Sequence, residues 1–276
     1  MRKCVILLPI LILSFLINSG CSTLELESTW KDRDIVLDGK GGDWLGAKYY
    51  FEDTAVSVGL INDEQNLYVS MMTENPMIWG QIMRQGLTVW LDAKGGKNKT
   101  FGIRFPLQRP RDEQEGERMA PRDMMDEAAR EKMMEKFQES MTELEVLGKN
   151  EEVLAKMNVE DAKGIVVKMR NAAGSLVYEL KVPLASSEEK PFALGVNPGD
   201  TIGVGFLSPK MQMRGPSGMR GGGRMPGGGG GMPPGGFGGM GGRSGMGGMG
   251  RMMPQELKIW AKVQLASASI PVLSFL

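Results

Sequence analysis

The chain has 276 residues, of which 41% are hydrophobic and 24% are charged, proportions that suit an ordinary globular protein of one or two domains. Lys plus Arg and Asp plus Glu number 33 each, so no overall charge favours nucleic acid or an acidic substrate. The chain has no His and only two Cys, which excludes Ser-His-Asp and Cys-His relays, His-bound zinc and ordinary His-ligated haem.

The N-terminal residues have the features of a secretion signal. Arg2 and Lys3 precede an uncharged apolar run, Val5 to Ile17, which is short for a membrane span. The run leads to Ser19-Gly20-Cys21, which resembles the lipobox of bacterial lipoproteins. This resemblance implies cleavage before Cys21, acylation of its thiol and attachment to a membrane. Several acyl chains, at about 0.8 kcal/mol per buried CH₂, would hold the protein firmly.

One position departs from the lipobox pattern, because Asn18 stands three residues before the cysteine where that family usually has Leu. An uncleaved anchor, or cleavage elsewhere by the general signal peptidase, is the alternative. Ser22 resembles the outer-membrane sorting signal of enteric bacteria, so we expect the outer membrane if the envelope is Gram-negative. If Cys4 leaves with the leader and Cys21 is acylated, no free thiol and no disulfide remains.

From Ile35 onward, short alternating segments are separated by Gly, Asn and Asp, a spacing typical of an all-β sandwich. Residues 55–60 and 67–71 alternate on either side of an Asn-Asp-Glu-Gln-Asn turn, which predicts a β-hairpin. A second pair of strands is predicted around the Gly95-Gly96 turn, at 86–92 and 100–105. Further strands are expected at 165–169, 176–182, 201–207 and 257–265.

Two segments interrupt this pattern. The first, residues 107–150, is dense in charge and methionine; Asp123 can cap a helix, and an apolar stripe recurs at helical spacing at Met134, Phe137, Met141 and Leu144. We expect a helical insertion that lies on the sandwich. The second, residues 209–254, is almost entirely Gly, Met, Arg and Pro and cannot bury enough apolar surface to offset its chain entropy, so we expect disorder.

Several motifs, in this order along the chain, look like the family 9 carbohydrate-binding module and the related DOMON sandwiches. They are Ile35–Gly39, Asp43-Trp44, the hairpin with Asn62–Val69, Val89–Asp92 and Leu176–Leu184. The resemblance covers about residues 35–265 without the insertions. It implies an antiparallel β-sandwich of two sheets that binds sugars or, in some members, haem. We therefore expect a signal peptide at residues 1–20, a linker at 21–34 and one sandwich domain at 35–276.

Sugar binders of this kind hold a saccharide against aromatic faces, so the resemblance makes Trp79, Tyr49 and Tyr50 candidate ligand-binding residues. Trp79 lies in a segment, Asn75–Gly80, that we interpret as a loop, and it is the better candidate for an exposed face. Trp44 and Trp90 lie within the fold-defining motifs, and we expect them to be core residues instead.

Methionine is abundant, with 23 residues, and many lie in the 209–254 insertion. Thioethers are soft ligands that could gather Cu(I), although the arginines of the same insertion would repel a cation. The alternative is a flexible tether that makes weak, promiscuous contacts. Some haem-binding relatives use Met and Lys as axial ligands, but no such pair can be matched here. We expect no cofactor, and the sequence identifies no metal ligands.

Acidic pairs such as Asp38 with Asp43, and Asp63 with Glu64, lie in predicted turns, where carboxylates usually accept backbone hydrogen bonds. A structural calcium or acid–base chemistry is the alternative. We expect no enzymatic activity. The sequence thus predicts an envelope lipoprotein with a non-catalytic binding module, whose partners are the membrane and a polysaccharide or an envelope protein, and not nucleic acid. A structural scaffold and a copper or haem carrier are the competing hypotheses.

Overall fold

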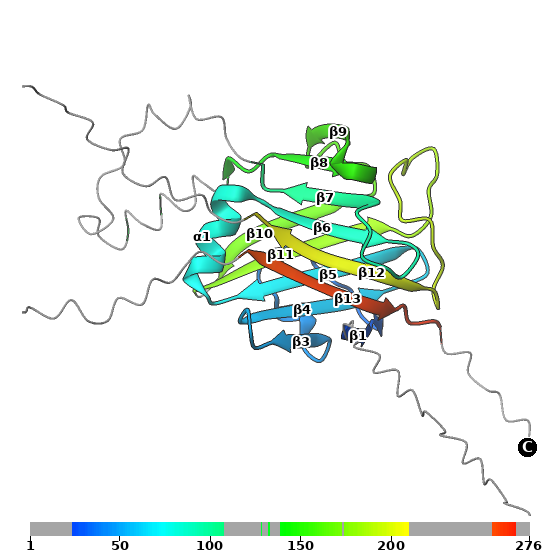
Figure 1. The fold of residues 1–276 in the computed structure, drawn as a ribbon, viewed down its shortest axis with the longest axis horizontal. Coiled ribbons are helices and arrows are strands. Elements are labelled where there is room, and N and C mark those ends of the chain that lie inside the picture. Colours follow the sequence, from blue (N-terminus) through cyan, green and yellow to red (C-terminus); the bar gives the residue numbers. More distant parts are fainter. Residues whose placement is uncertain are drawn as a thin grey trace, which may run out of the picture.

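The computed structural model describes residues 24–107, 128, 132, 139–172, 174–209 and 256–268. These residues form two stacked sheets with helix α1 (Pro76–Gln85) at one end, which confirms the all-β sandwich (Figure 1). The larger sheet has seven strands in the order β1-β13-β12-β6-β7-β8-β9. The smaller sheet has the order β10-β11-β5-β4-β2, and β3 pairs with β4 as well.

The strands of the larger sheet are β1 (Leu24–Glu27), β6 (Leu87–Asp92), β7 (Phe101–Phe105), β8 (Glu143–Leu147), β9 (Val153–Asn158), β12 (Thr201–Ser208) and β13 (Leu257–Gln264). Those of the smaller sheet are β2 (Thr29–Trp30), β3 (Lys48–Phe51), β4 (Val56–Asn62), β5 (Asn66–Thr73), β10 (Val166–Ala172) and β11 (Ser175–Pro183).

Alternation along the strands places apolar side chains between the sheets. In β13, Ile259 and Val263 are buried in the core, whereas Lys258 before them and Gln264 after them are exposed. The predicted hairpin is confirmed, since β4 and β5 pair antiparallel. The second predicted pair, β6 with β7, and the four further strands are confirmed as well.

The segment predicted as a linker, residues 21–34, contains two strands, so that prediction is wrong. β1 pairs in parallel with β13, and β2 pairs in parallel with β4, so this short segment joins the edges of both sheets. Between them, Ser28 donates to Oδ1 of the fully buried Asn62 at 2.5 Å, and the Asn62 carboxamide bonds both main-chain groups of Ala266. The partner strands lie far along the sequence, where local patterning cannot reveal them.

The predicted insertion at 107–150 is wrong at its C-terminal end, because β8 lies within it. Leu144, expected on a helical stripe, is a fully buried strand residue, as is Val146. Pairing with β7 buries both side chains on one face, so the period of two prevails over the helical spacing. Ala128, Lys132 and Glu139 are helical. Asp123, Met134, Phe137 and residues 210–254 lie outside the described residues, and the disorder of the second insertion stays a prediction.

Trp44 and Trp90 are buried, with 0% and 1% of their surface exposed, which confirms their assignment to core clusters. Each lies on the outer face of a sheet and not between the sheets. The indole of Trp44 donates to Glu179 at 2.9 Å, and the amide of Gly39 donates to the other oxygen of the same buried carboxylate at 2.6 Å. This carboxylate therefore fastens the segment before β3 to β11.

The signal segment, residues 1–20, and Cys21 lie outside the described residues, so their processing stays a prediction. Within the part of the chain that the structure describes, no helix is long and apolar enough to cross a bilayer.

Candidate functional site

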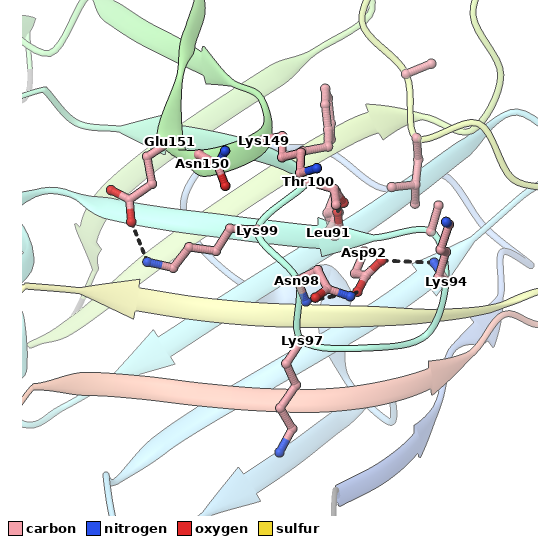
Figure 2. Close-up of a pocket in the computed structure, with 14 residues that line it drawn as sticks. Leu91, Asp92, Lys94, Lys97, Asn98, Lys99, Thr100, Lys149, Asn150 and Glu151 are labelled. Carbon is pink, nitrogen blue, oxygen red and sulfur yellow. Dashed lines mark hydrogen bonds and ion pairs between the residues drawn. The ribbon is translucent and has the colours of Figure 1, made fainter.

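A pocket of about 1090 Å³ opens at the end of the sandwich that lies away from α1 (Figures 1 and 2). Three segments that are distant in sequence line it: the β6–β7 loop at 92–100, the β8–β9 turn at 149–151, and residues 193–194 before β12. The half-buried Phe101 and Ala193 supply its accessible apolar lining, whereas Leu91 and Leu194 beside them belong to the buried core. Polar side chains of the two loops surround this lining.

The Asp92 carboxylate organises the β6–β7 loop. The side chain is 1% exposed and accepts hydrogen bonds from the amide of Lys94 at 3.1 Å, the amide of Asn98 at 2.9 Å and the Asn98 carboxamide at 2.8 Å. Burial alone would raise the pKa of Asp92, but these bonds, with one from the Gly96 amide, outweigh it and hold the pKa below its ordinary value. The loop therefore turns around a charged carboxylate.

A glycine in the neighbouring strand, β12, lets the backbone of this loop lie directly against that strand. A Cβ on Gly203 of β12 would come within 1.8 Å of the Gly96 carbonyl oxygen, which is backbone and cannot swing away. Gly203 is also the register partner of Asp92. Two interactions thus fix the loop: the hydrogen bonds that its amides donate to Asp92, and the close contact of Gly96 with Gly203 of β12.

The β8–β9 turn has an unusual residue at a left-handed position. Asn150 and Glu151 have φ values of 59° and 64°, and the Glu152 amide donates to the Lys149 carbonyl, as in the type I′ turns that favour Asn-Gly. Asn tolerates this conformation, whereas a Glu there costs about 1 kcal/mol or more. The Glu151 side chain uses its position to bond Lys99 at 2.5 Å across the pocket rim (Figure 2).

Lys99 is fixed from two sides. Its ammonium group lies 5.7 Å from the ring centroid of Trp90 in addition to its ion pair with Glu151. Trp90 itself covers Gly102 of β7, because a Cβ on that glycine would approach three indole atoms to 3.0 Å or less. The ion pair of Lys99 and Glu151 thereby joins the two loops of the pocket. The Lys99 hydrogen bond is also the main reason why the pKa of Glu151 lies below its ordinary value.

The same outer face carries a second tryptophan that the sequence analysis did not consider. Trp260 of β13, Gly205 of β12, Trp90 of β6 and Gly102 of β7 form one row across the sheet. A Cβ on Gly205 would approach the Trp260 indole to 2.6 Å, so this ring also covers a glycine. Trp260 is half-buried and packs against the Trp90 cluster. The alternation of β13 could have predicted this position, since Trp260 falls on the solvent side of the strand between two buried residues.

Several polar groups at the pocket mouth are not used by the protein. Among the described residues, Lys94, Lys97 and Lys149 have no ion-pair partner, and the Asn150 carboxamide has no hydrogen bond. All four side chains are exposed. The pocket therefore presents hydrogen-bond donors and acceptors around an apolar lining, an arrangement that can bind a ligand by its polar groups.

The three residues predicted to bind a ligand are not brought together. Tyr49 and Tyr50 are neighbours on β3, so their side chains project to opposite faces. Tyr49 is half-buried and its hydroxyl donates to the Glu27 carbonyl, whereas Tyr50 is 65% exposed. Trp79 lies on α1, which begins at the Asn75 cap and Pro76, and it packs partly against the core. The loop expected at 75–80 is wrong, and a ligand role for these residues stays a prediction.

Asp63 and Asp38 cap their turns, as expected, because each accepts backbone amides of its own turn. Asp63 accepts from the amides of Gln65 and Asn66 and from the Tyr68 hydroxyl, and Asp43 accepts from the Val36 amide. Asp38 pairs with Lys40 at 2.9 Å. In the described residues no group of three or more Cys, Asp or Glu could hold a metal ion.

No family model matches the sequence, and no curated protein matches it. Among solved structures, the chain is similar to a family 9 carbohydrate-binding module from Caldicellulosiruptor kristjanssonii in complex with glucose, with a TM-score of 0.33 and 11% identity over 67% of this chain and 77% of that one. The cellotriose complex of such a module from the same organism gives a TM-score of 0.32 and 12% identity over 67% and 75%. A likeness at this level carries no inference about ligand or site, and kinship with DOMON sandwiches stays a prediction.

Replacing Asp92 with Asn should destabilise the protein by about 2 to 3 kcal/mol, because a neutral amide cannot accept all the hydrogen bonds of the loop. The carboxylate's contribution is present above the unfolded pKa of 3.8 and is lost as pH falls through the lower folded pKa. Urea unfolding of wild type and Asp92→Asn should therefore differ at pH 7, and the difference should shrink as pH falls below 3.8 and through the lower folded pKa. Asp53→Asn, at an exposed turn, serves as the control, and equal stabilities at pH 7 would contradict this account.

Replacing Glu151 with Gly should leave the protein as stable as wild type, or more stable by up to about 1 kcal/mol. Asn-Gly relieves the left-handed strain, and a half-exposed ion pair contributes only about 0 to 1 kcal/mol. Glu151→Ala keeps the strain and loses the pair, so it should be the less stable variant in urea unfolding at neutral pH. A less stable Gly variant would show that the Lys99 pair outweighs the strain.

Proposed function

We propose that this chain is a lipid-anchored, non-catalytic binding protein of the bacterial cell envelope and that the pocket between the β6–β7 loop and the β8–β9 turn binds a saccharide. The observation that carries the proposal is the pocket itself, an apolar lining surrounded by unengaged amide and ammonium groups. A saccharide has the matching surface, since its C–H faces are apolar and its rim consists of hydroxyl groups.

The dimensions of the pocket favour an oligosaccharide over a single sugar unit as the ligand. Small-molecule sites usually measure about 300 to 1,000 Å³, and this pocket has about 1090 Å³ and an open mouth. Donors such as Lys94 and Lys149 come from two separate loops, so polar groups several sugar units apart could be bound at once. The exposed Asn150 carboxamide can donate to and accept from a hydroxyl group.

The position of the pocket suits an anchored module. The expected anchor, Cys21, precedes edge strand β1 by three residues, whereas the pocket lies beyond β6, β7 and β8. Three to five strand spacings of about 4.8 Å separate β1 from those strands, roughly 15 to 25 Å. β1 pairs with the last four residues of β13, Ala261–Gln264, so it lies in the pocket half of the sheet. The separation between the pocket and the strand that follows the anchor is therefore the lateral one across the sheet.

The carboxylates of the pocket support binding without catalysis. Glycoside hydrolysis needs a carboxylic acid with a raised pKa opposite a second free carboxylate. Asp92 and Glu151 have lowered pKa values instead, and each is engaged by the protein, Asp92 by loop amides and Glu151 by Lys99. Neither group is poised to donate a proton at neutral pH.

Substituting Asn150 with Gly should weaken binding to a polysaccharide that retards the wild-type protein by about 5- to 10-fold. The reason is that one exposed hydrogen bond to the ligand contributes about 1 kcal/mol. Glycine keeps the left-handed turn, so folding is preserved. Affinity electrophoresis against a broad panel of polysaccharides would measure the effect, with Tyr50→Ala and Trp79→Ala in parallel. Retention lost only in the Tyr50 or Trp79 variant would move the site to those residues, and no retention on any polysaccharide would refute saccharide binding.

Substituting Cys21 with Ser should remove the acyl groups from the protein, because the lipid is attached through the thiol. Wild-type protein extracted with detergent should have an intact mass that corresponds to a chain starting at Cys21 plus acyl groups. Fractionation of the two proteins gives the second measurement. A mature chain that starts elsewhere, or an unmodified Cys21, would refute the anchor and leave the saccharide pocket to be judged on its own test.

A further inference from the structure

The pocket is locally positive although the whole chain is neutral. Its lining residues include four lysines, Lys94, Lys97, Lys99 and Lys149, against Asp92 and Glu151. The whole chain has 33 residues of each sign. The residues that line the pocket therefore carry two excess positive charges, of which overall composition gives no sign.

The negative charges of the pocket are both engaged by the protein. The Asp92 side chain is 1% exposed and bonded to amides of its own loop. Glu151 is paired with Lys99, and its second oxygen lies 3.9 Å from Arg104. The charges left for a ligand are consequently all cations: Lys94, Lys97 and Lys149.

These three cations diverge and do not converge on one point. Figure 2 shows Lys149 on the β8–β9 turn, Lys94 at the opposite side of the β6–β7 loop, and Lys97 extending away from both. A single phosphate or sulfate ion is best bound by donors that point at one centre. Cations spread around the mouth fit a chain that carries repeated anionic groups.

We propose that the ligand of this pocket is an acidic polysaccharide, whose carboxylate or sulfate groups contact Lys94, Lys97 and Lys149 while its sugar rings lie over the apolar lining. The proposal rests on the saccharide-binding function and specifies its substrate class. Exposed ion pairs are individually weak and are screened by salt, so the selectivity comes from several contacts along one chain. The same field speeds encounter with an anionic polymer.

The test compares polymers that differ in charge and share a backbone: polygalacturonate with its methyl-esterified form, and dextran sulfate with dextran. Wild type should bind at least one acidic polymer with about 10-fold or higher affinity than the neutral polymer that shares its backbone. Lys94→Gln, Lys97→Gln and Lys149→Gln combined should weaken that binding by about 10- to 100-fold, since three exposed pairs contribute about 0.5 to 1 kcal/mol each.

The matched control combines Lys163→Gln, Lys168→Gln and Lys258→Gln, which remove the same charge from exposed positions outside the pocket. Its binding should stay within about threefold of wild type. An equal loss in the control would reduce the effect to net charge and overturn the proposal. So would equal retention of neutral partners, or competition by inorganic sulfate at the same charge concentration as the polymer. Failure of every polysaccharide to bind would instead refute the saccharide function on which the proposal rests.

Discussion

The pocket depends on a single buried carboxylate. Asp92 stands at the end of a central strand, where its desolvation is offset by amide donors from the six residues that follow. Because those donors lie on the loop itself, satisfying the carboxylate fixes the path of the chain from Ala93 to Asn98. Gly203 completes the arrangement, since any side chain there would displace the loop from β12. Lys94 and Lys97 have their positions because the Asp92 carboxylate fixes the loop that carries them.

The sandwich separates its two ends by what they carry. At one end, α1 lies beside the end of β12, where Gln81 donates to the Ser208 carbonyl at 2.8 Å and the Ser208 hydroxyl donates to Gly86. The chain leaves β7 and β12 at this end and re-enters at β8 and β13, so both long insertions begin and end there (Figure 1). The pocket occupies the opposite end. The described residues that flank the two insertions therefore lie at the end of the sandwich away from the pocket.

Local patterning predicted the β4–β5 and β6–β7 pairs, whose strands are close in sequence, but it missed β3 and the β8–β9 pair, which are equally local. The β4–β5 hairpin followed from alternation on both sides of one turn, and Asp63, which caps that turn, followed from its residue type. β1 was missed because its partner, β13, lies at the far end of the chain, and β8 was missed because Leu144 also fits the spacing of a helical stripe. Helix α1 carried a readable signal, Asn75 followed by Pro76, which the search for an exposed Trp79 obscured.

The pocket could not be predicted, because three segments far apart in sequence assemble it and because its charge is a local excess in a neutral chain. Aromatic residues drew the sequence-based search to Trp79, Tyr49 and Tyr50, which the fold distributes over one helix and both faces of one strand. A search for clustered lysines separated by glycine and asparagine, as in residues 94–99, would have found one of the three segments.

The strained β8–β9 turn is the strongest structural indication that the pocket has a function beyond connecting two strands. Glycine at 151 would meet the backbone requirement of the turn, yet the chain has a glutamate there, whose ion pair with Lys99 is half-exposed and therefore weak. Stability alone does not explain that choice. Position explains it: with Lys99 held between Glu151 and the Trp90 ring, the two loops are joined, and the remaining lysines are spaced around an open mouth. A residue that costs folding energy while ordering a charged rim is what a binding site requires.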